Sequence, residues 1–142
     1  MKALLCNNIF NDVILKYHEK DDINFKYPNP FNAKTLEYLL FEKCWIDTVQ
    51  WHLEDHVRKP NLNPKVGIEI KKRIDTLNQR RTDIVEKIDD YYFNFFKTIK
   101  TQNNKINTES PGWVVDRMSI LCLKIYHMNE QTLRENVSED HI

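Results

Sequence analysis

The stretch that decides the fold is residues 64–100, PKVGIEIKKRIDTLNQRRTDIVEKIDDYYFNFFKTIK. Apolar side chains recur in it at alternating intervals of four and three residues, which is typical of a helix packed in a bundle. A guanidinium interrupts this row where an apolar side chain is expected. Because a buried charge is costly, it must be paired or must face a cavity or a ligand. The row is Ile70, Ile74, Leu77, Arg81, Ile84, Ile88, Tyr91 and Phe95.

This helix would be roughly 54 Å long at about 1.5 Å per residue. That length exceeds the width of a small domain, so we expect a bend or an overhanging end. Its last third is strongly aromatic, with five rings between residues 91 and 96. Exposed aromatic surface of this extent favours aggregation, so some of these rings should pack on the first helix or on a second copy of the chain.

Three further amphipathic helices are predicted over residues 3–20, residues 32–59 and the segment that follows Ser110. The second carries two adjacent apolar rows and should therefore lie centrally. Asn32, Asn63 and Ser110 are good N-caps, and a proline follows Asn63 and Ser110 at the first helical position, where its missing N–H costs nothing. The core row predicted for the last helix is Val114, Met118, Leu121, Ile125 and Met128.

These segments predict a single all-α domain over residues 1–142, an up-and-down helical bundle of four main helices with short connections. Residues 138–140, Ser-Glu-Asp, look like the start of another helix. We therefore expect a C-terminal helix that is missing or that docks elsewhere.

Composition excludes several functional classes. Lys plus Arg and Asp plus Glu both number 21, which is unlike the basic surplus of a general nucleic-acid binder. The 2 glycines lie far apart, which excludes the glycine-rich loop of a P-loop or Rossmann nucleotide-binding motif. No apolar run reaches the roughly 20 residues that cross a membrane. The apolar part at the start of the chain is too short for a signal sequence, so we expect the cytoplasm. The three cysteines have no paired spacing and are expected to be buried and reduced.

Three blocks of this sequence resemble a bacterial family known as domain of unknown function 4254, found largely in Bacteroidetes. The resemblance implies an all-helical cytoplasmic protein. It brings no reaction and no catalytic residues, and members usually continue past the point where this chain ends. The blocks are Trp45–Asp55, Arg73–Asp90 and Ile106–Met128.

Arg81 defines the main candidate site. Charged residues of both signs, two indoles and a histidine on the second and fourth helices could line a polar pocket for a small anionic or aromatic ligand. The other reading is a closed network of buried ion pairs that fixes helix register. The predicted ligand-binding residues are Asp47, Trp51, Glu54, Arg81, Trp113, Asp116, Arg117, Lys124 and His127.

A metal site is a second possibility. His52 and His56 are one helical turn apart, a spacing that can hold a metal ion. Leu53 stands where a zinc protease needs glutamate, so the pair is only a weak indication of a metal site. No histidine has a glutamate three residues before it, which excludes a di-iron bundle.

Acidic side chains from the second and third helices form another candidate metal set, which could hold Mg²⁺ or Mn²⁺ against a substrate diphosphate. Part of this set is similar to the acidic motif of all-helical nucleotide pyrophosphohydrolases, whereas Arg58 replaces an acid that the motif requires. The other reading is a solvated acidic face balanced by Lys87 and Arg80. The set is Glu54, Asp55, Glu86 and Asp89.

Two functional hypotheses follow. The first is a binding or accessory module with a polar pocket for a small anionic ligand, no cofactor, and self-association through the aromatic helix end. The second is a metal-dependent hydrolase of a nucleotide or another phosphorylated small molecule. Neither hypothesis involves nucleic acid or a membrane, and whether the protein is an enzyme stays open.

Overall fold

The computed structural model describes residues 2–103 and 105–134, and its elements are four α-helices. They are α1 (Ala3–Lys20), α2 (Leu36–Val57), α3 (Pro64–Phe96) and α4 (Pro111–Thr132). Within the described residues there is no strand, so the predicted all-α bundle is confirmed. No described helix combines the length and apolar character needed to span a membrane. The helix start predicted at residues 138–140 lies outside the described residues.

The predicted caps form at two of the three helix starts after α1. The Asn63 side chain accepts a hydrogen bond from the Lys65 N–H at 2.9 Å, and Ser110 Oγ accepts one from the Trp113 N–H at 3.3 Å. At α2 the cap is Thr35. Asn32 instead accepts a hydrogen bond from the Lys34 N–H in a turn before the helix, so α2 begins three residues later than predicted.

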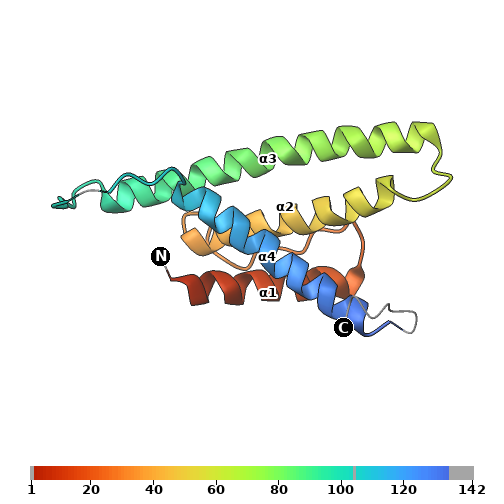
Figure 1. Cartoon of the computed structure of the whole chain (residues 1–142), viewed down its shortest axis with the longest axis horizontal. Coiled ribbons are helices and arrows are strands. Elements are labelled where there is room, and N and C mark those ends of the chain that lie inside the picture. The colour runs from red at the N-terminus through yellow and green to blue at the C-terminus, as the bar shows by residue number, and fades with distance from the viewer. Residues whose placement is uncertain (1, 104, 135–142) are drawn as a thin grey trace.

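Helix α2 lies at the centre and contacts each of the other three helices. Helices α1 and α2 run in the same direction, because contacts near both ends of α1 share a sequence offset of 34 residues: Phe10 with Cys44 and His18 with His52. Helix α3 runs antiparallel to them and α4 runs parallel, as Figure 1 shows. The chain direction is therefore up, up, down, up, so the up-and-down order predicted from the sequence does not hold between α1 and α2.

The first connection, residues 21–35, differs from the short links that were predicted. It is an extended crossover that returns along the bundle so that α2 can start beside the start of α1 (Figure 1). Glu42 on α2 anchors it by accepting hydrogen bonds from Lys26 at 3.0 Å and Asn29 at 3.1 Å. Arg73 on α3 donates to the carbonyl oxygen of Ile23. Its prolines and its contacts with two helices keep this segment extended.

Helix α3 follows the predicted row closely. Ile74, Leu77, Ile84 and Ile88 are buried, and Arg81 is partly buried between them. The C-terminal end of α3 extends beyond the rest of the bundle (Figure 1). Three rings of this end, Phe93, Phe95 and Phe96, are therefore exposed, as the predicted overhang implies. The prediction that Phe95 belongs to the core row is wrong, because this residue lies on the overhanging end.

The row predicted as the core of α4 is wrong. Leu121, Ile125 and Met128 are each more than half exposed. Helix α4 instead turns a neighbouring face inward, and two polar residues of that face bond to groups on α2 and α3. This face also places small side chains where the helices approach closely. It consists of Gly112, Val115, Asp116, Ser119, Cys122 and Leu123.

Gly112 marks the closest approach between α4 and α3. A Cβ atom at this position would collide with the carbonyl oxygen of Val85 and would lie 2.9 Å from Asp89 Oδ1. The same Asp89 oxygen accepts a hydrogen bond from the Gly112 N–H at 2.6 Å, which satisfies one of the free N–H groups at the start of α4. The contact fixes where α4 begins and so places the polar face that follows.

Candidate functional site

A cluster of charged side chains lies in the interior where α2, α3 and α4 meet. Its centre is Lys43, whose side chain is 0% exposed. Lys43 and Asp47 are one turn apart on α2, and their side chains form an ion pair. Lys43 Nζ also lies 2.8 Å from Asp116 Oδ1 on α4. Because a buried ammonium needs opposite charge nearby, these two carboxylates account for its presence in the core.

Arg81 completes this charged network. Its Nε and Nη2 atoms donate to the two carboxylate oxygens of Asp116 at 2.6 and 2.7 Å, which is the bidentate geometry of strong arginine–carboxylate pairs. Arg81 Nε also lies 3.8 Å from Asp47 Oδ1. Ser119 Oγ donates to Asp47 Oδ2 at 2.6 Å. Two cations therefore face two carboxylates, and the guanidinium is the one charged group of the four with substantial exposure, at 28%.

The carboxylates of the network respond differently to their surroundings. Burial acts to raise the pKa of Asp116, but the hydrogen bond from Arg81 and the charge of Lys43 outweigh it, and the pKa falls below its usual range. For Asp47, burial raises the pKa and exceeds the opposing effect of Lys43. Consistent with this, Asp47 Oδ1 is buried and has no hydrogen-bond partner among the described residues. Ionised Asp116, paired with Lys43 and Arg81, is therefore the carboxylate that both cations of the network share.

A polar pocket of about 510 Å³ adjoins the network at Asp116. It is formed by residues 107–109, which precede α4, together with the first turns of that helix. On its wall, Arg117 Nε is 2.8 Å from Glu109 Oε1, and Trp113 is 42% exposed. The lining residues are Asn107, Thr108, Glu109, Trp113, Asp116 and Arg117.

The remaining predicted ligand-binding residues lie elsewhere. Trp51 and His127 stack face to face at the other end of α4, with ring centroids 4.8 Å apart. Glu54 is partly exposed on α2 and Lys124 is exposed on α4. Neither makes a hydrogen bond or an ion pair within the described residues. The predicted set therefore divides into the charged network, the pocket beside it, and an aromatic region further along α2 and α4.

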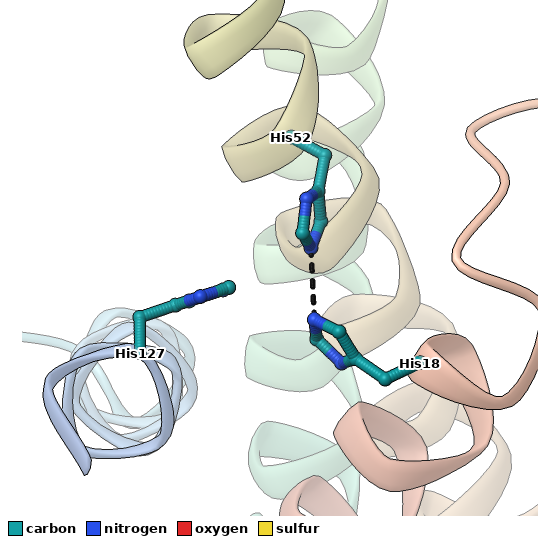
Figure 2. A group of neighbouring side chains, drawn as sticks. All are labelled: His18, His52 and His127. Atoms are coloured by element: carbon teal, nitrogen blue, oxygen red, sulfur yellow. Dashed lines mark hydrogen bonds between the residues drawn. The ribbon is translucent and has the colours of Figure 1, made fainter. Parts of the chain in front are cut away.

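That aromatic region contains three histidines from three helices, His18 on α1, His52 on α2 and His127 on α4 (Figure 2). One ring nitrogen from each lies within 4.8 Å of those of the other two. His52 Nε2 and His18 Nε2 are 3.1 Å apart. Among the described residues, this histidine cluster is the one group of three or more histidine, cysteine or acidic side chains with metal-ligand proximity.

Two rings of the histidine cluster, those of His52 and His127, favour the uncharged form. Burial lowers the pKa of His52 to about 4, with further lowering by the charges of His18 and His127. Burial is also the main cause that lowers the pKa of His127, against the opposing influence of Glu130. At neutral pH these two imidazoles are therefore neutral, and each retains a nitrogen lone pair.

Sequence reasoning singled out His52 and His127 separately but missed His18 and Lys43. His52 was considered with His56, one turn further along α2, whereas its structural neighbours come from other helices. The parallel arrangement of α1 and α2 brings His18 to His52, and this arrangement depends on the crossover. Lys43 carried a local signal, its spacing of four residues from Asp47 within a doubly apolar helix.

The structure does not bring the four acidic residues of the predicted magnesium or manganese site together. Gln50 of α2 bonds Asn78 of α3, and the helices are antiparallel, so Glu54 and Asp55 lie toward the start of α3. Glu86 is two turns beyond Asn78 in the opposite direction, which separates the two acidic pairs by more than about 15 Å along the helix axes. Asp89 is bonded to the start of α4.

The molecule is thus an all-α bundle with a charged interior network and a separate histidine cluster. The chain belongs to the family described as "Protein of unknown function (DUF4254)", which it matches over residues 37–142. This confirms the resemblance found in the three sequence blocks. Neither a curated protein nor a solved structure matches the chain. Helix α1 and the crossover precede the matched residues.

Proposed function

We propose that the protein is a binding module that takes a small anionic molecule with an aromatic part in the polar pocket beside Asp116. The observation that carries this proposal is the composition of the pocket wall. An arginine and an exposed indole lie four residues apart on one face of α4, in a cavity of about 510 Å³. The pocket volume is within the range that accommodates a small ligand.

Arg117 supplies the anion-binding group. Its side chain is 75% exposed, and its Nε contacts Glu109. The Nη groups make no hydrogen bond to described residues, so the fork of the guanidinium is available to a carboxylate or phosphate. Trp113 offers an apolar ring against which a planar ligand can stack. A nucleotide or an aromatic carboxylate has both features.

Glu109 already contacts the Arg117 guanidinium, to which the anionic group of a ligand would also bind. Its carboxylate already neutralises Arg117, and an incoming anion has to displace it or share the guanidinium. This arrangement makes opposite predictions for two neighbouring residues. Removing the arginine weakens binding, whereas removing the glutamate charge strengthens it.

A thermal-shift screen of nucleoside phosphates, sugar phosphates and aromatic carboxylates tests the proposal, followed by calorimetry on any hit. We expect Arg117→Ala to weaken binding by roughly 10- to 100-fold, the value of a charge-assisted hydrogen bond. Glu109→Gln should tighten binding. Arg58→Ala is the matched control, because Arg58 is exposed at the end of α2, outside the lining of this pocket. Binding that is unchanged in Arg117→Ala, or no hit at all, contradicts the proposal.

We also propose self-association with a second copy through the overhanging end of α3. Phe93 and Phe95 are 71% and 63% exposed, which is unusual for neighbouring rings in a monomer. A groove of about 370 Å³ lies between this end and the starts of α1 and α2, and it is lined by Leu5, Leu36, Tyr91, Phe95 and Phe96 among others. Light scattering after gel filtration should give a dimer for the wild type and a monomer for Phe93→Ser/Phe95→Ser. A wild-type monomer at high concentration contradicts it.

A hydrolase that uses Glu54, Asp55, Glu86 and Asp89 is not proposed, because these side chains do not converge. The cytoplasm is the location that fits the proposal, since the three cysteines are buried and free. Fractionation of cells that express the full chain tests this location.

A further inference from the structure

We propose that His18, His52 and His127 form a binding site for one divalent transition-metal ion, with Zn²⁺ as the first candidate. The site is separate from the anion pocket and does not depend on it. Figure 2 shows the three rings converging, with His127 pointing from α4 toward the gap between the other two. Each ring comes from a different helix, so the site is assembled only in the folded bundle.

The nitrogen spacing is close to that of a metal site, and the shortest of the distances also fits the hydrogen bond between His18 and His52. Zinc bonds imidazole nitrogens at about 2.0–2.1 Å, so two nitrogens of a tetrahedral zinc site lie roughly 3.3 Å apart. His18 Nε2 and His52 Nε2 are already 3.1 Å apart. The nitrogen of His127 lies within 4.8 Å of both. A small movement of the His127 ring closes the triangle around an ion.

Two of the three rings are oriented by an acceptor on their other nitrogen. The Ile14 carbonyl lies 2.7 Å from His18 Nδ1, which must carry the hydrogen because a carbonyl oxygen only accepts. His18 Nε2 is therefore the lone-pair nitrogen of the neutral ring. His127 Nδ1 lies 3.5 Å from a Glu130 carboxylate oxygen. A carboxylate or carbonyl behind the ring is the usual partner of a metal-ligating histidine.

His127 Nε2 supplies an independent observation. This atom is buried and has no hydrogen-bond partner among the described residues. A buried nitrogen without a partner forfeits the hydrogen bond it would make to water, so native structures usually satisfy such groups. A metal ion at the centre of the cluster satisfies it directly.

His52 completes the site by changing its tautomer. In the metal-free cluster, His52 Nε2–H donates to the lone pair of His18 Nε2. Metal binding requires the lone pair of His52 Nε2 as well. The hydrogen moves from Nε2 to Nδ1 of His52 through solvent, so the ring stays neutral and no proton is gained or lost overall.

Aromatic rings hold the three imidazoles in place. Tyr17 stacks on His52 at 4.7 Å, and Trp51 stacks on His127 at 4.8 Å. Tyr126 packs on His18 at 4.3 Å. Rings that are fixed by packing on both faces or edges lose little freedom when a metal binds, which favours affinity.

The donor set determines the class of metal. Imidazole suits zinc, copper, nickel and iron, whereas magnesium and calcium prefer oxygen ligands. Three protein ligands leave a fourth position for water or an exogenous ligand, as in zinc sites that are not purely structural. The inference therefore concerns a transition-metal site in which the protein supplies three of the four ligands.

The test uses the full chain after removal of metal with a chelator. Zn²⁺ is titrated in competition with a chromophoric chelator, and Co²⁺ is titrated by its visible absorption. We expect one ion per chain in the wild type. His127→Gln and His18→Gln should each weaken binding by more than about tenfold, and Glu130→Gln by about tenfold. His56→Gln is the matched control, because it removes a histidine one turn from His52 and should leave affinity unchanged.

X-ray absorption of the zinc-loaded wild type provides a measurement that needs no variant to fold. It should report a first shell with three imidazoles. The proposal is overturned by the absence of stoichiometric binding, by equal affinity in wild type and His127→Gln, by loss of binding in His56→Gln, or by a first shell with fewer than three imidazoles.

Discussion

The charged network and the histidine cluster both join α2 to α4, yet they are built on opposite rules. Along α2, Asp47 of the network is about one and a half turns from His52 of the cluster. In the network, two cations meet two carboxylates, and each charged group has an oppositely charged partner inside the protein, although Asp47 Oδ1 makes no hydrogen bond to the described residues. In the histidine cluster, three groups of the same kind converge and leave a buried nitrogen without a partner. Oppositely charged side chains can pair with one another directly. Imidazole nitrogens that each present a lone pair need a hydrogen or a metal ion between them.

The largest expected effect is on the free energy of unfolding, and it should be large for a substitution in the charged network and small for one in the histidine cluster. Asp116→Ala leaves Lys43 and Arg81 without their shared carboxylate and should lower the free energy of unfolding by about 3–5 kcal/mol. His127→Gln, measured without metal, should cost within about 1 kcal/mol. Urea denaturation followed by circular dichroism measures both. Asp75→Ala is the control, because its ion pair with Lys71 is exposed to solvent and contributes little to stability. Equal costs for Asp116→Ala and Asp75→Ala would mean that the network is not structural.

A middle-sized effect is expected from the contact that places α4. Gly112→Ala introduces a methyl group against the Val85 carbonyl and should cost about 1–3 kcal/mol through overpacking. Gly67→Ala is the matched control, since its nearest neighbour, Leu62 Cδ2, is at an ordinary 3.4 Å. Because alanine favours helices, Gly67→Ala should be neutral or stabilising by up to about 1 kcal/mol. Thermal denaturation that ranks the two variants in the reverse order contradicts the close packing of α3 and α4.

The smallest effect is a pH dependence that belongs to the network. The folded pKa of Asp116 is lower than its ordinary value of 3.8, so the unfolded chain takes up a proton more readily. The ionised carboxylate therefore stabilises the fold fully above about pH 4, and this stabilisation is lost as pH falls through the folded pKa. Calorimetry from pH 6 downward should show a steeper loss of Tm for wild type than for Asp116→Asn. Asp90→Asn, an exposed position on α3, should keep the wild-type slope.

Much of the fold could be read from the sequence because local signals determined it. The row through Arg81, the caps at Asn63 and Ser110 and the central position of α2 all depend on residues close in the chain. The face of α4 could not be read in this way. Both sides of α4 carry apolar residues, and the choice between them depends on Asp116 and Ser119 meeting α2 and α3.

The two candidate sites differ in the same respect. Arg81 was visible because it interrupts an apolar row, and its pairing with Asp116 confirms the expected need for a partner. The histidine cluster carried no such signal. His18, His52 and His127 are separated by 34 and 75 residues, and only the direction of α1 relative to α2 brings the first two together.

The crossover between α1 and α2 has a consequence for the order of folding. Helices α2 and α3 are joined by a short turn and can pair early, whereas α1 must wait for a longer loop to close before it meets α2. Substitutions in the α1 interface, such as Phe10→Leu, should then accelerate unfolding and leave the refolding rate nearly unchanged. The amino-terminal helix would dock after α2 and α3 have paired, and the meeting of its histidine with the other two would accompany the completion of the native state.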